Sequence, residues 1–269
     1  MPARPARRLA FAAFRAILAR DLAVVRKTLV FFAMRTVTQP LLFVFVFAYV
    51  FPRIRQGVGG STQAATSFST LLVPGIVASS ITFQGIQTVA LPLVQEFGFT
   101  REIDDRVMAP LPVWGIAVTK IVSGAVQSAI AAVMVIPFAL LIPLTPVHLD
   151  IKWLELVSVA VLACLMAGAF GLAVGTRFEP RQVPLIFSIL LLPMTMLGAV
   201  YYPWIRLDAI PWLKWVVLVN PLLYMSEGLR MATTSLPHMS AWAVYLALVG
   251  ATAGFTWLSL RGFKRRVLA

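Results

Sequence analysis

Charged residues that could bind a partner or take part in catalysis are concentrated in one short segment, QEFGFTREIDDRVMAPLP at positions 95–112. It holds four of the ten acidic residues of the chain, namely Glu96, Glu102, Asp104 and Asp105. Thr100 is a suitable N-cap for a short helix, and Pro110 is a suitable stop. The segment therefore predicts a short, strongly charged helix between two long apolar stretches.

Charge pairing within this helix does not explain its excess of acidic side chains. Two pairs of opposite charge are spaced i,i+4, namely Arg101–Asp105 and Glu102–Arg106. Such pairs stabilise a helix by only about 0.2–0.5 kcal/mol each. Two interpretations remain open: a solvated helix in a surface loop, or a rigid, mixed-charge surface that docks a cytoplasmic partner.

Motifs for catalysis or for ATP binding are absent from the sequence. His148 and His238 are the only histidines, and there is no HExxH, no GxSxG and no cluster with metal-ligand spacing. The glycine-rich stretch GVGGST at 57–62 lacks the lysine of a phosphate-binding loop. We therefore expect no enzyme activity and no cofactor or metal bound by this chain. If it takes part in an ATP-driven process, the ATPase is another polypeptide.

The composition indicates a membrane protein. Only 12% of the residues are charged and the mean hydropathy is +0.89, whereas soluble domains are about 25% charged. Long intervals without Asp, Glu, Lys or Arg each supply the roughly 20 residues that a helix needs to cross a bilayer. We expect an all-α polytopic membrane protein with six transmembrane helices, at residues 30–52, 69–94, 113–142, 153–176, 183–203 and 240–260.

The basic residues are distributed unevenly between the two sides of this topology. Of the 23 Lys and Arg residues, 17 fall on the side of the two termini and six on the other. The positive-inside rule then places both termini in the cytoplasm. Because the net charge of +13 is explained by this asymmetry, we expect no nucleic-acid partner. The first 30 residues lack the pattern of a cleaved signal peptide.

Two further segments are amphipathic but do not match a simple span. Residues 5–27 gather apolar side chains on one arc and most of their basic ones on the other. This pattern predicts an interfacial helix on the inner leaflet, or else a cytoplasmic extension of the first span. Residues 204–230, rich in Trp and broken by Pro, predict one or two short re-entrant helices in the outer half of the membrane rather than a seventh span.

Three stretches lie at the ends of predicted spans: LLVPGIVAS opening the second span, FTREIDDRVMAPLPVWGIAVTKI entering the third, and VNPLLYMSEGLR before the last. They resemble the membrane subunits of ABC-2 type exporters, most closely the daunorubicin-resistance type permeases. The resemblance covers nearly the whole chain. One departure is the loop TREIDDR, which is more acidic than the family's usual Gly-Thr pair followed by one acidic and one basic residue.

The resemblance implies a single ABC-2 type transmembrane domain over residues 1–269. Residues 99–109 would be the coupling helix that docks on an ABC ATPase, with contacts from Thr100, Arg101, Glu102, Asp104, Asp105 and Arg106. Residues 204–230 would cap the outer end of the pathway, with a motif of Asn220, Pro221, Glu227 and Arg230. It also implies a homodimer of permeases in the bacterial inner membrane, with two ATPase subunits that carry the ATP and Mg.

Spans two and five are the candidates for lining a seam between the two permease copies. Their polar residues are Ser79, Ser80, Thr82, Gln84, Gln87 and Thr195. Hydroxyl and amide groups on an apolar seam suit a hydrophobic or amphipathic substrate such as a drug, a lipid or a lipid-linked glycan. They are equally consistent with ordinary hydrogen bonds between helices.

The rival function is an ion-coupled secondary carrier, which needs an ionisable group deep in the membrane. Glu227 is the best candidate for that group, and its spacing from Arg230 predicts either an i,i+3 ion pair or a helix cap. Lys120 and Glu155 lie near the ends of their spans, from which their side chains can reach the membrane surface. An enzyme embedded in the membrane is a third and weaker interpretation.

Overall fold

The computed structural model describes residues 6–54, 62–96, 112–178, 182 and 187–268. Within these residues every regular element is a helix and none is a strand, so the predicted all-α fold is confirmed for the part of the chain that is described. The predicted coupling segment, 99–109, lies outside it.

Five of the described helices are long and apolar enough to cross a membrane. The first is built from α2 (Leu29–Val44), a π-helical segment η1 (Phe45–Val50) and α3 (Phe51–Arg53), and the others are α4 (Thr62–Gln95), α6 (Val113–Leu141), α7 (Trp153–Arg177) and α12 (Ala241–Leu268). They correspond to five of the six predicted spans. Two of them are longer than predicted, because α4 begins before residue 69 and α12 continues past residue 260.

The predicted fifth span, 183–203, differs from the structure at its end. Its described part is a π-helical segment η4 (Phe187–Leu191) followed by α9 (Leu192–Met196), after which the chain turns. Ala199 has a φ of 51°, a left-handed conformation that stops a helix. The described helix therefore ends well before residue 203 and is not among the five long helices.

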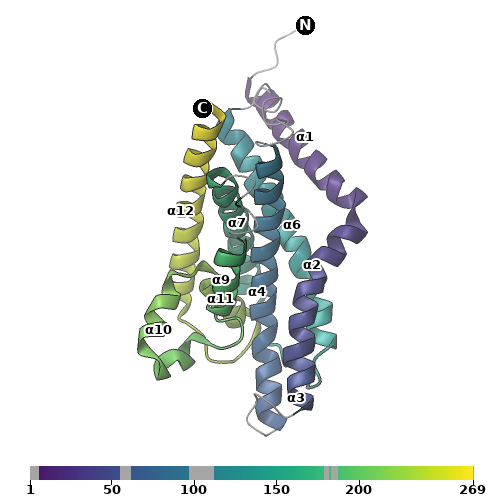
Figure 1. The fold of residues 1–269 in the computed structure, drawn as a ribbon, viewed down its shortest axis with the longest axis vertical. Helices are drawn as coiled ribbons and strands as arrows, with labels where there is room; N and C mark the ends of the chain where they lie inside the picture. Colours follow the sequence, from purple (N-terminus) through teal and green to yellow (C-terminus); the bar gives the residue numbers. More distant parts are fainter. Residues whose placement is uncertain (1–5, 55–61, 97–111, 179–181, 183–186, 269) are drawn as a thin grey trace.

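The helix α4 forms the centre of the bundle. It contacts α2, α6, α7 and the shorter helix α11 (Pro221–Thr233), and Figure 1 shows it running along the middle of the molecule. Almost every residue between Phe68 and Gln95 is buried. By contrast, few residues of α2 and α12 are buried, as expected for helices that face lipid.

Small residues let α4 and α7 approach closely. A Cβ added to Gly171 would lie 2.5 Å from the Gly85 carbonyl oxygen, and one added to Gly85 would lie 2.6 Å from Ala167 Cβ. Both distances are too short for atoms that are not bonded to each other, so neither position has room for a Cβ. The two backbones therefore meet directly, which is the packing that small residues favour between membrane helices.

The N-terminal helix α1 (Ala6–Lys27) covers nearly the residues predicted for the interfacial helix. It packs against α6. Phe14, Ile17, Leu18 and Leu22 are half-buried, whereas Phe11 and Val24 are exposed. Part of the predicted apolar surface of α1 is thus in contact with the rest of the chain, and the other part is exposed.

The segment before α12 consists of short helices. They are η5 (Trp204–Ala209), α10 (Pro211–Val216), η6 (Val217–Val219) and the longer α11. The first three lie at the end of the bundle away from the C-terminus (Figure 1), and α11 is buried against α4, α7 and α12. The structure has short helices at this place, and their re-entry into the membrane stays a prediction.

Candidate translocation site

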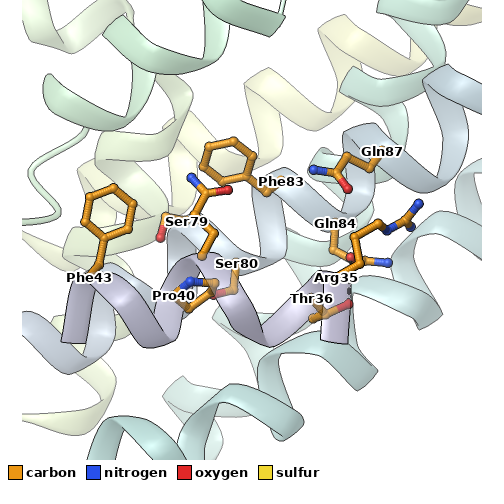
Figure 2. Close-up of a pocket in the computed structure, with 10 residues that line it drawn as sticks. Arg35, Thr36, Pro40, Phe43, Ser79, Ser80, Phe83, Gln84 and Gln87 are labelled. Atoms are coloured by element: carbon orange, nitrogen blue, oxygen red, sulfur yellow. Dashed lines mark hydrogen bonds between the residues drawn. The ribbon is translucent and has the colours of Figure 1, made fainter. Parts of the chain in front are cut away.

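A small polar cavity lies between α2 and α4 (Figure 2). Its volume is about 20 Å³, enough for about one water molecule. From α4 it is lined by Ser79, Ser80, Phe83, Gln84 and Gln87, and from α2 by Arg35, Thr36, Gln39, Pro40 and Phe43. Four of the six residues predicted for the translocation seam are therefore gathered at one place.

The amide of Gln84 is the polar group of this cavity with an unmet hydrogen-bonding need. Its Oε1 accepts a hydrogen bond from Thr36 Oγ1 at 3.0 Å. Its Nε2 is buried and has no partner among the described residues. Ser79 and Ser80 are satisfied within their own helix, since each hydroxyl donates to the carbonyl oxygen of Ile76 at 2.8 Å.

The other two predicted seam residues lie elsewhere. Thr82 Oγ1 donates to the Ala78 carbonyl oxygen at 3.0 Å and contacts Met225 Sδ of α11 at 3.3 Å. Thr195 donates to the carbonyl oxygen of Leu191 within its own segment, at 3.0 Å. These two hydroxyls make the ordinary helix and interhelical contacts that were the alternative interpretation.

A larger chamber opens on the other side of Arg35. Its volume is about 560 Å³, and α1, α2, α4 and α6 enclose it. The polar and charged side chains on its wall are Arg20, Asp21, Thr28, Arg35, Gln87, Thr88, Gln95, Glu96, Lys120, Ser123 and Gln127. The sequence pattern did not predict this chamber, because its wall combines α1 and α2 with the later helices α4 and α6.

A buried ion pair lies on the wall of the chamber. Lys120 Nζ donates to Glu96 Oε1 at 2.7 Å, and both side chains are more than nine-tenths buried. The pair joins the end of α4 to α6. Sequence reasoning expected Lys120 to reach the membrane surface instead. The sequence does contain one indication of this pair. Glu96 is an acidic residue at the end of the second predicted span, and a carboxylate there needs a basic partner.

The motif before the last span holds α11 to the end of α9. Asn220 Oδ1 accepts from the Leu222 backbone N–H at 3.0 Å and so caps α11, which begins at Pro221. Asn220 Nδ2 donates to the Met194 carbonyl oxygen at 2.7 Å. The Asn-Pro dipeptide therefore starts one helix and satisfies the end of another.

Glu227 and Arg230 form a fully buried ion pair, one of the two arrangements that their spacing predicted. Arg230 Nη1 donates to Glu227 Oε1 at 2.5 Å, and Nη2 donates to the Ala199 carbonyl oxygen at 2.9 Å. The carboxylate also accepts the backbone N–H groups of Trp204 at 2.9 Å and Met239 at 2.8 Å. The pair thus ties α11 to the loops on both sides of it.

Of the remaining candidate residues, Glu155 and His148 lie in the described part of the chain. Glu155 lies near Lys152 at 3.9 Å, and the backbone N–H of His148 donates to Thr70 Oγ1. No group of three metal-ligand side chains occurs in the described ranges. The proposed ATPase contacts, Thr100, Arg101, Glu102, Asp104, Asp105 and Arg106, lie in residues 97–111, outside the described part.

Comparison with known proteins identifies the family of this bundle. A family model described as "ABC-2 type transporter" matches residues 12–233, which include most of α1 and all of α2, α4, α6, α7 and α11. The chain belongs to the ABC-2 type transporter family.

Curated relatives agree with this assignment. The chain is similar to the inner membrane transport permease YadH of Escherichia coli (strain K12), with 24% identity over 197 residues, which are 71% of this chain and 74% of the relative. The same values hold for the YadH proteins of Escherichia coli O157:H7 and Shigella flexneri. Together with five apolar helices, the family makes this chain a multi-pass membrane protein of the transport permease type.

Proposed function

We propose that this ABC-2 chain is the membrane-spanning permease subunit of an ATP-driven exporter in a bacterial inner membrane. The match of the family model over residues 12–233 carries the proposal. The sequence has no phosphate-binding loop, so a separate ABC ATPase hydrolyses the ATP and holds its Mg. Two ATPase subunits and two permease copies form the complete transporter.

The proposed orientation follows from charge. The beginning of α1 and the end of α12 lie at the same end of the bundle (Figure 1). That end also carries Arg177 and the basic cluster Arg261, Lys264, Arg265 and Arg266. Under the positive-inside rule this end is cytoplasmic. The segment 183–203 would then complete six spans with both termini inside, and α1 would lie on the anionic inner leaflet.

Coupling to the ATPase is proposed to run through residues 99–109. This segment directly follows α4 and Glu96, and Glu96 is fastened to α6 by Lys120. A push on the coupling helix would therefore act on the two helices together. Because α4 forms one wall of both polar cavities, its movement would change the size of both.

The polar lining of an otherwise apolar bundle supports a hydrophobic or amphipathic substrate. A drug, a lipid or a lipid-linked glycan would meet amide and hydroxyl groups at Gln84, Gln87, Ser79 and Ser80. The short helices between Trp204 and Val219, held by the Glu227–Arg230 pair, would cap the outer end of the pathway as a re-entrant segment.

An ion-coupled carrier receives less support. Glu227 is engaged by Arg230 and by two backbone N–H groups, and Lys120 is paired with Glu96. A coupling site needs a group that binds and releases its ion during each cycle. These two side chains are instead held within the fold.

The docking role is tested by charge reversal in the full-length chain, with Glu102→Lys, Asp104→Lys and Asp105→Lys combined. The triple variant and the wild type are each assembled with the ATPase, and the stimulation of ATP hydrolysis by the permease is measured. We expect membrane insertion to be normal and stimulation to be lost. Full stimulation by the variant would contradict the proposed docking surface.

A further inference from the structure

Arg35 lies at the junction of three cavities. It lines the small polar cavity, the large chamber, and a third cavity of about 460 Å³. The third is an open apolar groove formed by Thr38, Gln39, Leu42, Phe43, Val46 and Phe47 along α2 and η1. One side chain therefore stands where a polar compartment meets an apolar one.

Arg35 has no direct partner within the described residues. Its guanidinium makes no ion pair or hydrogen bond there, the residue is exposed, and it lies in a helix long enough to span the membrane. A charged side chain at such a position is costly unless an anion or water accompanies it. The other basic side chain on the chamber wall that lies within a span, Lys120, is paired with Glu96.

A second donor lies at the same place. Gln84 is 3% exposed, and its Nε2 has no hydrogen-bond partner in the described part of the chain. Figure 2 shows Arg35, Gln84 and Gln87 together at one end of the small cavity, with Phe43 at the other. An unmatched amide N–H beside an unmatched guanidinium makes the site rich in donors, which favours an anionic acceptor.

The apolar groove has the length of one membrane leaflet. From Arg35 to Val46 a helix rises roughly 16 Å, close to half of the ~30 Å hydrocarbon thickness. Its wall is made by Leu42, Phe43, Val46 and Phe47. An alkyl chain in the groove would place its head group beside Arg35.

We propose that this site binds an amphiphile with an anionic phosphate head group and an apolar chain. Arg35 contacts the head group through its planar fork, which matches phosphate geometry, and Gln84 Nε2 donates a further hydrogen bond. The chain lies in the groove along α2. The inference narrows the substrate class of the proposed exporter and rests on that function for its biological role. The binding itself requires no ATPase.

The test measures lipid binding to the full-length chain in a nonionic detergent. Phosphatidic acid and phosphatidylcholine with the same acyl chains are titrated, and bound lipids are counted by native mass spectrometry. The wild type is expected to prefer phosphatidic acid by about tenfold, since hydrogen bonds between charged groups are stronger than those to neutral ones. Arg35→Gln should remove this preference, and Arg35→Lys should keep part of it.

Two further variants distinguish binding at this site from nonspecific attraction of anionic lipid to the basic protein. Gln84→Glu keeps the size of the side chain and its acceptor for Thr36 but adds a negative charge, so phosphatidic acid should bind several-fold more weakly. Arg26→Gln removes an exposed charge of α1 and should leave the preference unchanged. Equal loss in Arg26→Gln and Arg35→Gln would overturn the proposal, as would wild-type binding by both Arg35→Gln and Gln84→Glu.

A second arm identifies the source of the bound lipid. The chain is reconstituted with its ATPase, and ATP-dependent transfer of phosphatidic acid between leaflets is followed. Transfer that Arg35→Gln abolishes assigns the site to cargo, whereas binding without transfer assigns it to a resident membrane lipid. If no ATPase assembles with the chain, the export function fails, and the binding result still decides the site.

Discussion

At the scale of single residues, Glu227 and Arg230 connect α11 to the loops that precede and follow it. The carboxylate accepts from Arg230, Trp204 and Met239, and the guanidinium reaches Ala199. The i,i+3 pairing follows from the sequence alone. The other contacts join residues 12 to 31 positions apart, which no local pattern reveals.

Breaking this pair should destabilise the protein strongly. Arg230→Leu leaves the buried Glu227 carboxylate without its cation, and Glu227→Gln leaves Arg230 without its anion; removing one partner of a buried pair costs about 3–5 kcal/mol. Thermal unfolding in detergent measures the effect. The double variant Glu227→Gln/Arg230→Leu should be less destabilised than the sum of the two. Additive losses would contradict a direct pair.

Breaking the buried Glu96–Lys120 pair should lower both coupling and stability, so stimulation is compared at equal amounts of folded permease. Lys120→Glu places two carboxylates together, and we expect the permease to lose most of its stimulation of ATP hydrolysis. The exchange Glu96→Lys/Lys120→Glu restores opposite charges and should recover part of it. The exposed Lys152, near Glu155, provides the control Lys152→Glu, which should have little effect. A charge exchange no better than the single variant would argue against the pairing.

At the scale of elements, the bundle depends on direct backbone contact between α4 and α7. Gly171, Gly85 and Ala167 remove the side chains that would separate them. In a membrane, where burial of apolar surface does not drive helices together, such close packing is a main source of attraction. Two glycines of α12 have a different environment, since nothing lies within 4 Å of a Cβ placed at Gly250 or Gly254.

This contrast gives a matched pair of substitutions. Gly171→Ala would place its Cβ 2.5 Å from the Gly85 carbonyl oxygen, so the helices must separate, and overpacking of this kind costs about 1–3 kcal/mol. Gly254→Ala meets open space and should be neutral or slightly stabilising, because alanine favours a helix by about 1 kcal/mol over glycine. Melting temperatures in detergent measure both variants. Similar melting temperatures would show that α4 and α7 are not packed as described.

The sequence predicts the long helices well, because the absence of charged residues is enough to locate them. Long charge-free intervals locate α2, α4, α6, α7 and α12, because the bilayer admits few alternatives to an apolar helix. The same signal fails after α9. The interval from Arg181 to Arg206 contains no charge, yet the chain turns at Ala199, whose carbonyl oxygen is held by Arg230. A distant side chain fixes that turn, so local composition does not reveal it.

The candidate site was predictable in its residues but not in its arrangement. The polar residues of the second span stand out against an apolar background, and four of them line one cavity. Nothing in the sequence singles out Arg35 from the other basic residues near the N-terminal end of the chain. Its place at three cavities depends on the packing of α2 against α4 and of α1 against α6, which is a property of the tertiary structure.

At the scale of the whole molecule, the chain has polar compartments and tight packing but no site for ATP chemistry within the described residues. Its cavities lie along α4, and the segment that follows α4 is the proposed place of contact with the ATPase. This organisation fits a subunit that is moved by a partner. The proposed function therefore depends first of all on the existence of that partner.

The most direct measurement is a pull-down of the tagged chain from its native membrane in mild detergent, followed by identification of the proteins that co-purify. We predict a soluble ABC ATPase in a one-to-one ratio with the permease, released when Glu102, Asp104 and Asp105 are changed to Lys. A chain that purifies without any ATPase, even in the mildest detergent, would contradict the account.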